Sequence, residues 1–321
     1  MDLSDRPTGW GGDPVPRPSL EDIRAAAGRI HGKVVRTPLI PLHSYEAATD
    51  IYLKPEVLQP IGSFKLRGVL NWASRLTEEA RQKGLSTTSS GNTAQALGYV
   101  ARLFDIPSRT LLPDTVPPHK LDAILSYGVE PVQLPFDQLL NSMLQEHWKE
   151  EPYSYLNPWG DPDMIAGSGT IGLEIVDDLS DVNTVFAPVG GGGLIAGIGS
   201  ALKALNPAIR VIGVQPESCP TLQKAFEADR GLWIQAGATV CDGTAVPVIV
   251  DEMYSLLREV VDGVTLVPEE AIKDAIQLVT LKNKLIVEGS GALSVAAALS
   301  TPVDQRGKSV CILSGGSIDT E

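Results

Sequence analysis

A lysine lies within the apolar stretch "IGSFKLRG" at residues 61–68, between an aromatic residue and a leucine, and the glycines close on both sides predict a turn there. Most lysines are solvated surface residues, and that alternative applies to Lys65 as well. An amine that is withdrawn from water has a lowered pKa, so it can act as a base, and it can also form a Schiff base with an aldehyde. Lys65 is therefore the first candidate for a catalytic residue.

Four successive glycines, residues 190–193, follow the strand-like run "TVFAPV" and precede a helical pattern. Backbone N–H groups in such a turn point at an anion, and the dipole of the following helix favours negative charge. The alternative is a tight turn that only lets the helix pack closely, but four glycines carry a large entropic cost on folding, which favours a phosphate site. An amine near a phosphate site suggests pyridoxal phosphate, an aldehyde cofactor that Lys65 would hold.

Two further glycine-containing turns, "SSGN" at 89–92 and "LSGGS" at 313–317, are expected where a strand ends and a helix begins. In open α/β sheets, ligands bind at the carboxyl ends of strands, so the three turns are expected to line one cleft. The turn "SSGN" is also explained by helix capping alone, because Ser and Asn are preferred caps. With Lys65 upstream, a site for a substrate carboxylate becomes the better interpretation. Its amides and hydroxyls come from Ser89, Ser90, Gly91, Asn92 and Thr93.

The elements that position these turns alternate along the chain. Short runs rich in β-branched and apolar residues predict strands, and longer stretches with apolar residues at helical spacing predict helices. This alternation predicts an α/β protein with parallel sheets that are covered by helices. Strands are expected at residues 51–54, 86–90, 109–113, 131–134, 184–189, 211–215 and 309–313, and helices at 19–30, 94–104, 164–179, 194–205, 269–282 and 291–299. The turn-rich stretch "NPWGDPD" at 157–163 predicts a domain boundary.

Composition excludes several classes of function. The 321 residues carry a formal net charge of −13 without a cluster of Lys and Arg, so no nucleic-acid partner is expected. The three cysteines lack CxxC spacing, which predicts neither a disulfide framework nor a zinc site and indicates a reducing compartment, the cytoplasm. The uncharged run 182–202 is split by Pro188 and the glycines, so no membrane span is expected. The Gly- and Pro-rich residues 1–18 are interpreted as a loose lead-in and not as a signal peptide.

Five motifs together resemble the tryptophan-synthase-β type (fold type II) of pyridoxal-phosphate enzymes, and within it the serine/threonine dehydratase and serine racemase branch. They are "LQPIGSFKLRG", "TSSGNTAQ", "PVGGGGLIAGI", "VEGSGA" and "LSGGSID", and they span nearly the whole chain. The resemblance implies two open twisted sheets covered by helices, with the cofactor in an interdomain cleft. It also implies a large cofactor-binding domain (1–74 plus 159–321), a small substrate-loop domain (75–158) and a homodimer. Because the chain ends shortly after "SGGSID", no C-terminal regulatory domain and no feedback control by isoleucine are expected.

The resemblance also implies roles for individual residues. Lys65 would carry the cofactor and act as the catalytic base, Asn92 would bind the cofactor's O3′, and Ser314 would face the pyridine nitrogen. A hydroxyl there does not hold the ring nitrogen protonated, so the cofactor is a weaker electron sink and prompt loss of a β-substituent is favoured. The cofactor-binding residues implied in this way are Phe64, Lys65, Asn92, Asn157, Gly190, Gly191, Gly192, Gly193, Leu194 and Ser314.

The function expected from these residues is the dehydration and deamination of a β-hydroxy-α-amino acid, such as L-threonine or L-serine, to a 2-oxo acid and ammonia. Racemization of serine or a related amino acid is the main alternative, because Ser90 stands where serine racemases have their second acid/base. Thr93 stands where many dehydratases have His and resembles the "SGNT" of cysteine synthases, so a β-replacement reaction stays open.

A nicotinamide-dependent oxidoreductase is the outside alternative, because Gly191, Gly193 and Ala196 fit the loose pattern G-x-G-x-x-A. The next strand ends at Gln215, where a ribose-binding acid is expected, so this alternative is weak. Gln215 and Thr221 also stand where racemase-like relatives have the Glu and Asp that hold a divalent cation. Hard cations prefer carboxylate oxygens, so no metal is predicted.

Overall fold

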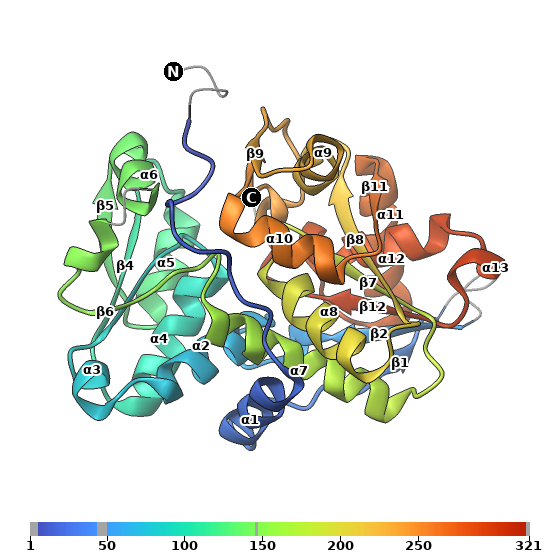
Figure 1. Cartoon of the computed structure of the whole chain (residues 1–321), viewed down its shortest axis with the longest axis horizontal. Helices are drawn as coiled ribbons and strands as arrows, with labels where there is room; N and C mark the ends of the chain where they lie inside the picture. Colours follow the sequence, from blue (N-terminus) through green and yellow to red (C-terminus); the bar gives the residue numbers. More distant parts are fainter. Residues whose placement is uncertain (1–5, 44–49, 145–146, 319–321) are drawn as a thin grey trace.

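The computed structural model describes residues 6–43, 50–144 and 147–318, and it shows an α/β fold with two main sheets (Figure 1). The larger sheet has six strands in the order β1-β2-β12-β7-β8-β11. Neighbouring strands in this sheet are parallel, except that β1 and β2 are antiparallel. These strands are β1 (Ile40–Pro41), β2 (Ile51–Pro55), β7 (Thr184–Pro188), β8 (Arg210–Pro216), β11 (Gly263–Val267) and β12 (Ser309–Leu313).

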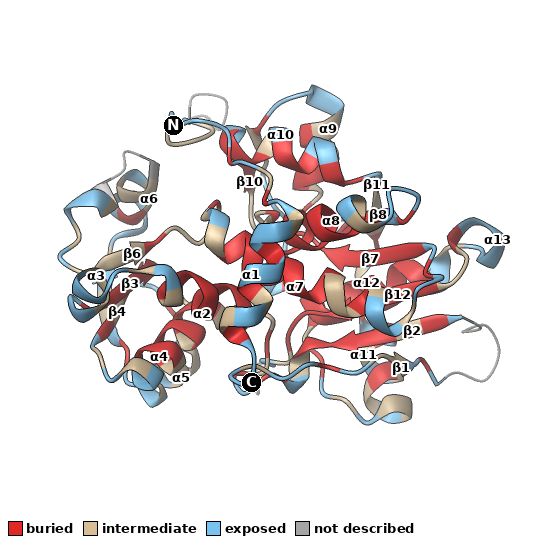
Figure 2. Cartoon of the chain, turned by 60° about the horizontal axis from the view of Figure 1, so that its bottom comes forward, coloured by how far each residue is buried: buried red, intermediate tan, exposed pale blue. Residues whose placement is uncertain are grey.

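Alternate side chains of the larger sheet enter two different cores, as the period of two along a strand requires. On β7, Val185 and Ala187 belong to one core, whereas Phe186 between them belongs to the other. Both faces are therefore buried, which explains why the central strands are continuous apolar runs (Figure 2). The first core is covered by α7 (Pro162–Asp178), α8 (Gly193–Leu205) and α10 (Asp251–Val260), and the second by α11 (Glu269–Leu278) and α12 (Gly289–Ser300).

The smaller sheet has four parallel strands in the order β5-β4-β3-β6, all from residues 85–156. They are β3 (Leu85–Thr88), β4 (Ser108–Pro113), β5 (Glu130–Leu134) and β6 (Ser154–Leu156). The helices in this part of the chain are α3 (Glu78–Gln82), α4 (Asn92–Phe104), α5 (Pro118–Ser126), α6 (Phe136–Leu144) and the short η3 (His147–Glu150).

Helix α2 (Lys65–Arg75) lies between the two sheets, because it packs against α4 on one side and α7 on the other. Helix α1 (Leu20–Ile30) packs on α7 and begins with the expected capping box of Ser19 and Asp22. The remaining elements are α9 (Thr221–Ala228), α13 (Val303–Arg306), the antiparallel pair β9 (Leu232–Trp233) and β10 (Val248–Ile249), the 3₁₀ turns η2 (Glu56–Leu58) and η4 (Asp242–Thr244), and the π-helix η5 (Val279–Asn283).

All seven expected strands are present, with ends that differ by at most two residues. The helix expected at 269–282 is present as α11, which continues directly into the π-helix η5. Two expectations about elements were wrong. Lys65 does not lie in a turn but begins α2, and the turn "LSGGS" is not followed by a helix in the part of the chain that is described. Strands β6 and β11 were not expected, because the first has three residues and the second begins at a glycine.

The N-terminal segment is not a loose lead-in over its described part. Backbone hydrogen bonds join Thr8 to Asp251 (3.0 Å) and Val15 to Glu252 (2.8 Å), so this segment is attached to the start of α10. Residues 1–5 of the expected lead-in lie outside the described residues.

Candidate active site

A cavity of about 450 Å³ is lined by residues that follow the carboxyl ends of strands in both sheets. Thr88 and Pro113 end β3 and β4 of the smaller sheet, whereas Pro188 and Ser314 lie at the ends of β7 and β12 of the larger one. The three glycine-containing turns therefore line one cavity, as the sequence predicted. The lining includes these predicted site residues: Phe64, Lys65, Ser89, Ser90, Gly91, Asn92, Thr93, Gly190, Gly191, Gly192, Gly193, Leu194 and Ser314.

Asn157 is the predicted site residue that does not line the cavity. Its Oδ1 atom accepts a hydrogen bond of 2.9 Å from the backbone N–H of Trp159. The side chain therefore shapes the turn between β6 and α7, and the neighbouring Pro158 and Trp159 face the cavity in its place.

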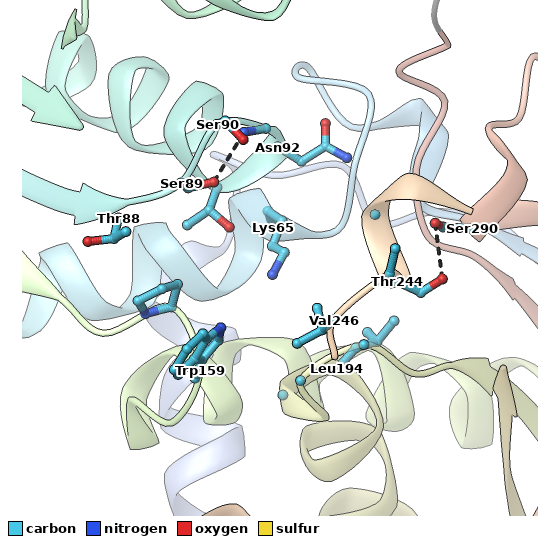
Figure 3. A pocket seen from close by; sticks show the side chains of 18 of the residues that line it. Lys65, Thr88, Ser89, Ser90, Asn92, Trp159, Leu194, Thr244, Val246 and Ser290 are labelled. Atoms are coloured by element: carbon cyan, nitrogen blue, oxygen red, sulfur yellow. Dashed lines mark hydrogen bonds between the residues drawn. The ribbon is translucent and has the colours of Figure 1, made fainter. Parts of the chain in front are cut away.

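The amine of Lys65 lies in the middle of the cavity, between the serine-containing loop and the glycine turn (Figure 3). Its Nζ atom lies 5.0 Å from the centre of the Phe64 ring. Burial lowers the pKa of Lys65 to about 8, although the charge of Glu288 acts in the opposite direction. The amine therefore becomes neutral, and able to act as a base or nucleophile, much nearer to neutral pH than an ordinary lysine.

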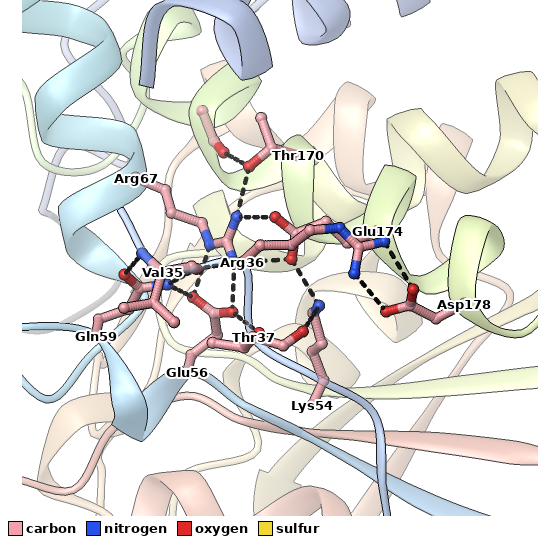
Figure 4. A network of polar contacts seen from close by, with 11 residues as sticks. Val35, Arg36, Thr37, Lys54, Glu56, Gln59, Arg67, Thr170, Glu174 and Asp178 are labelled. Carbon is pink, nitrogen blue, oxygen red and sulfur yellow. Dashed lines mark hydrogen bonds and ion pairs between the residues drawn. The ribbon is translucent and has the colours of Figure 1, made fainter. Parts of the chain in front are cut away.

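A buried network of charges holds the start of α2, where Lys65 lies (Figure 4). The guanidinium of Arg67 donates to both carboxylate oxygens of Glu56 at 2.7 and 2.8 Å and to Oε1 of Glu174 at 2.6 Å. The Lys54 amine donates to Oε2 of Glu174 at 2.6 Å. Although burial opposes ionization, Arg67 holds the pKa of Glu56 below its usual value. Two cations and two carboxylates thus join η2, α2, α7 and β2, and Arg67 lies two residues after Lys65 in α2.

The loop at residues 89–93 is held by the strand beside it. The backbone N–H of Ser89 donates to the carbonyl of Leu111 at 3.1 Å, and the Thr110 hydroxyl donates to the carbonyl of Ser89 at 2.7 Å. The Ser89 hydroxyl accepts from the N–H of Gly91 at 3.2 Å, just before α4 begins. A Cβ built on Gly91 would meet no atom within 4 Å, so this point of the loop opens to the cavity.

The glycine turn joins β7 to the 13-residue helix α8. Gly192 is the N-cap and has φ +97°, a conformation that favours glycine. Gly190 is packed closely, because a Cβ there would lie 3.0 Å from Cγ2 of Val246. A Cβ on Gly193 would meet no atom within 4 Å. The first N–H groups of α8 therefore border open space, which is the arrangement that binds a phosphate.

The far end of the cavity has a buried acid and a hydroxyl. Burial raises the pKa of Glu288 to about 7. Its carboxylate accepts from the side-chain amide of Asn92 at 3.4 Å and from the backbone N–H of Ser317 at 3.0 Å. The Ser317 hydroxyl donates to Oδ1 of Asn92 at 2.8 Å. Ser314 is buried, and its hydroxyl forms no hydrogen bond with the described residues.

Sequence reasoning missed or set aside several lining residues. Trp159 and Glu288 line the cavity but were not predicted as site residues, because a tryptophan at a turn and an acid at the start of a helix have ordinary structural explanations. The turn "DGTAV" at 242–246 was not predicted, although Asp and Gly are common in turns. Helix α6 was not predicted either. The overlooked lining residues include Phe136, Leu139, Leu140, Met143, Asp161, Trp233, Thr244, Val246 and Ser290.

Three further charged groups line the cavity, which are Lys120, Asp161 and Asp242. Lys120 of α5 forms an ion pair with Asp242 of η4, so the two parts of the chain are joined at the cavity. Asp161 caps α7 by accepting from the N–H groups of Asp163 and Met164, and burial raises its pKa to about 6.

The two positions considered for a cation are used by other contacts. Oε1 of Gln215 accepts from the N–H of Leu222 at 2.8 Å, its amide donates to the carbonyl of Val189 at 3.2 Å, and the Thr221 hydroxyl donates to the carbonyl of Val246 at 2.8 Å. In the described part of the chain, no group of three or more His, Cys, Asp and Glu side chains is arranged to hold a metal. None of the described helices has the length and apolar character that a membrane span requires.

Comparison with known proteins gives a consistent picture. The family model described as "Pyridoxal-phosphate dependent enzyme" matches residues 30–315. The L-threonine ammonia-lyase of Geobacter sulfurreducens is 39% identical over 304 residues, which are 93% of this chain and 75% of that protein. The catabolic L-threonine dehydratase TdcB of Escherichia coli K12 is 38% identical over 94% of this chain and 93% of its own length.

Solved structures show the same fold. The threonine deaminase of T.th. superposes with a TM-score of 0.85 at 36% identity, covering 95% of this chain and 100% of that one. Maize serine racemase superposes with a TM-score of 0.86 at 28% identity, covering 95% of each chain.

Proposed function

Because the chain belongs to the family of pyridoxal-phosphate dependent enzymes, we propose that it converts a β-hydroxy-α-amino acid to a 2-oxo acid and ammonia. L-threonine is the first candidate substrate and L-serine the second. The observation that carries this proposal is that relatives 38–39% identical over more than nine-tenths of the chain are named L-threonine ammonia-lyase or dehydratase. The cavity around Lys65 contains the groups that this reaction needs.

The residues present fit the cofactor. The open space beside Gly193, at the start of a long helix, provides N–H donors for a phosphate. The unpaired hydroxyl of Ser314 is available for a ring nitrogen, and the Lys65 amine is available for an aldehyde. When bound, pyridoxal phosphate supplies an electron sink that acidifies the Cα–H bond of an amino acid.

Lys65 is the proposed base. Its pKa of about 8 lets Nζ accept a proton from Cα near neutral pH and release it afterwards. The hydroxyl on Cβ then leaves with a proton, and the released enamine hydrolyses to the 2-oxo acid and ammonia. The loop at 89–93 is proposed to bind the substrate carboxylate through N–H and hydroxyl groups at the start of α4, where negative charge is favoured. Phe64, Asn92, residues 190–194 and Ser314 are proposed to bind the cofactor, and Asn157 stays a weaker candidate.

Racemization is the second candidate function, because Ser90 lies in the cavity and two structural neighbours at 28–31% identity are titled serine racemase. The Ser90 hydroxyl would then move a proton on the face opposite Lys65. A nicotinamide-dependent reaction has no support from the family, and the side chain of Gln215 is engaged by backbone groups. Neighbours titled cysteine synthase and O-ureido-L-serine synthase, at 20–21% identity, share the fold alone and give no support to β-replacement.

The organization of the protein is also proposed. We propose that residues 75–158 form a small domain that carries the substrate loop and that residues 1–74 and 159–321 form a large one, with the cofactor between them. The four-stranded sheet within residues 85–156 supports this division. A homodimer and a location in the cytoplasm stay predictions from the sequence.

The proposal is tested by absorbance and product release together. The purified protein, supplied with pyridoxal phosphate, is mixed with L-threonine, L-serine and larger β-hydroxy amino acids, and the visible spectrum, 2-oxo acid and amino-acid chirality are recorded. A spectral change with release of 2-oxo acid supports the lyase. A change in chirality without 2-oxo acid would support racemization instead, and a spectrum that no amino acid alters would refute both.

A further inference from the structure

The described N-terminal segment, residues 6–15, runs past α10 and then turns toward α1 (Figure 1). We call this segment the N-terminal strap. At its start, the carbonyl of Pro7 accepts a hydrogen bond of 2.7 Å from the indole N–H of Trp233, and the Arg6 guanidinium lies 5.5 Å from the centre of the same ring. Trp233 lines the cavity, so the strap contacts a residue of the candidate active site.

The middle of the strap is anchored to α10. The Thr8 hydroxyl is hydrogen-bonded to the Asp251 carboxylate, and the N–H groups of Gly11 and Gly12 donate to Oε1 of Glu252 at 2.8 and 3.2 Å. Glu252 is only 3% exposed, and the strap provides the hydrogen bonds of its Oε1 atom, whereas Oε2 has no hydrogen-bond partner among the described residues. These bonds fix both ends of the dipeptide between Thr8 and Gly11, which is Gly9 and Trp10.

Trp10 supports a second tryptophan of the cavity. A Cβ built on Gly160 would lie 2.8 Å from Cη2 of Trp10 and 3.0 Å from Cγ2 of Val15, so the Trp10 ring lies directly against the backbone of the turn that carries Trp159. On its other side, Trp159 faces the glycine turn, because a Cβ on Gly191 would lie 3.4 Å from Cδ1 of Trp159. The turn that carries Trp159 therefore lies against the strap, and the Trp159 ring lies against the glycine turn.

Trp159 and the serine-containing loop lie on opposite sides of the Lys65 amine (Figure 3). A substrate whose carboxylate is bound by the loop would place Cα beside Lys65 and direct its other substituents toward Trp159. We propose that the N-terminal strap is a specificity-determining part of the substrate site, because it fixes the wall that limits the size of the β-substituent. This inference rests on the proposed function, since it assigns the substrate's side chain to the wall of Trp159 and Trp233.

A purely structural role would make the strap a support for α10 alone. The two roles differ in what they predict for Trp10→Ala. Removing the ring leaves a void behind the Trp159 turn, so the wall can yield and hold a small substrate less tightly. A substitution that weakens the binding of the substrate and of the transition state equally raises KM and leaves kcat unchanged.

The experiment compares the wild type with Trp10→Ala, Trp10→Phe and Phe104→Ala as full-length holoenzymes. Phe104 is at the end of α4, away from the cavity lining, so its replacement controls for the loss of a packed aromatic ring. We expect Trp10→Ala to raise KM for L-threonine at least fivefold with kcat within twofold, and to raise kcat/KM for 3-phenylserine relative to L-threonine at least fivefold. In Trp10→Phe, the KM for L-threonine and the preference between the two substrates should lie close to the wild-type values. In Phe104→Ala, both quantities should equal those of the wild type.

The affinity for L-valine, which has a branched side chain but no β-hydroxyl to lose, is measured by calorimetry for the same proteins. Release of 2-oxo acid by the wild type decides the proposed function, whereas the ratio of L-valine affinities tests the strap independently of the reaction. A fivefold weaker affinity in Trp10→Ala, absent from Phe104→Ala, supports the proposal. Unchanged affinity and unchanged substrate preference in Trp10→Ala, with a lower melting temperature, would show that the strap only stabilises the fold.

Discussion

The side-chain amide of Asn92 donates to Oε1 of Glu288 across 3.4 Å, which joins the first residue of α4 to the residue that precedes α12. This contact holds the Glu288 carboxylate at the wall of the cavity that contains Lys65. Burial lowers the pKa of Lys65, whereas the Glu288 charge favours the protonated amine, so both decide the pH at which this amine becomes neutral.

Replacing Glu288 with Gln should lower the pKa of Lys65 below its value of about 8. The reason is that the carboxylate, whose own pKa is about 7, is mostly ionized where Lys65 titrates. The measurement is the rate at which the cofactor-free protein gains visible absorbance with pyridoxal phosphate, because only the neutral amine reacts. The midpoint of this rate should move to lower pH in Glu288→Gln. Glu259→Gln, which removes an exposed acid paired with Arg17, should leave the midpoint where it is; a midpoint that rises in Glu288→Gln would contradict this account.

Two neighbouring glycines should respond differently to the same substitution. Gly192→Ala forces a side chain into φ +97° and within 2.8 Å of Cδ1 of Leu257, so the free energy of unfolding should fall by about 1–3 kcal/mol. Gly193→Ala meets no protein atom, so stability should stay within about 0.5 kcal/mol of the wild type while cofactor affinity falls. Urea unfolding of the cofactor-free protein and titration with pyridoxal phosphate separate the two effects. Full cofactor affinity in Gly193→Ala would argue against a phosphate at this turn.

Breaking the buried ion pairs that Arg67 forms with Glu56 and Glu174 should have a large effect on stability. Arg67→Met leaves Glu56 and Glu174 without their main partner and should lower the free energy of unfolding by about 3–5 kcal/mol. The matched control is Arg36→Met, whose ion pair with Asp178 is half exposed and should contribute only about 0–1 kcal/mol. Both are measured by urea unfolding, and equal losses in the two variants would show that the buried network has no special weight.

Ser90→Ala separates carboxylate binding from proton transfer. Loss of one hydroxyl in the substrate loop should raise KM for L-threonine by roughly fivefold, because a hydrogen bond contributes about 1 kcal/mol, and should leave kcat nearly unchanged. Any conversion of L-serine to D-serine should disappear, as followed by chiral chromatography. Ser126→Ala, on the exposed side of α5, is the control. Racemization that persists in Ser90→Ala would assign the second proton to another group.

The sequence predicted those features that local patterns encode. Glycine and hydroxyl residues predicted the strand-to-helix turns at residues 89–92 and 190–193. The β-branched or apolar runs before these turns predicted the strands. Lys65 was recognised for its chemistry, but its position at the first turn of a helix was not, because Gly62 and Gly68 on either side favoured a turn. Gly68 is instead needed where α2 crosses α7, since a Cβ there would lie 2.7 Å from the carbonyl oxygen of Met164.

Contacts between distant residues could not be predicted in this way. Asn92 and Glu288 are 196 residues apart, and Arg67 reaches Glu174 across 107 residues. Trp10 lies against the turn of Trp159, and although the turn-rich stretch around Trp159 was recognised, nothing in it pointed to Trp10. Such pairs arise from the packing of helices between two sheets, and a single sequence carries no local signal for them.

The central claim is that the Lys65 amine is the base and cofactor-binding group of an amino-acid ammonia-lyase. The most direct test measures 2-oxo acid release from L-threonine, together with the visible spectrum, in the wild type and in Lys65→Ala supplied with pyridoxal phosphate. The account predicts release and a visible band that responds to substrate in the wild type, and neither in Lys65→Ala, with unfolding curves showing that the variant is folded. Release of 2-oxo acid by folded Lys65→Ala at the wild-type rate would contradict it.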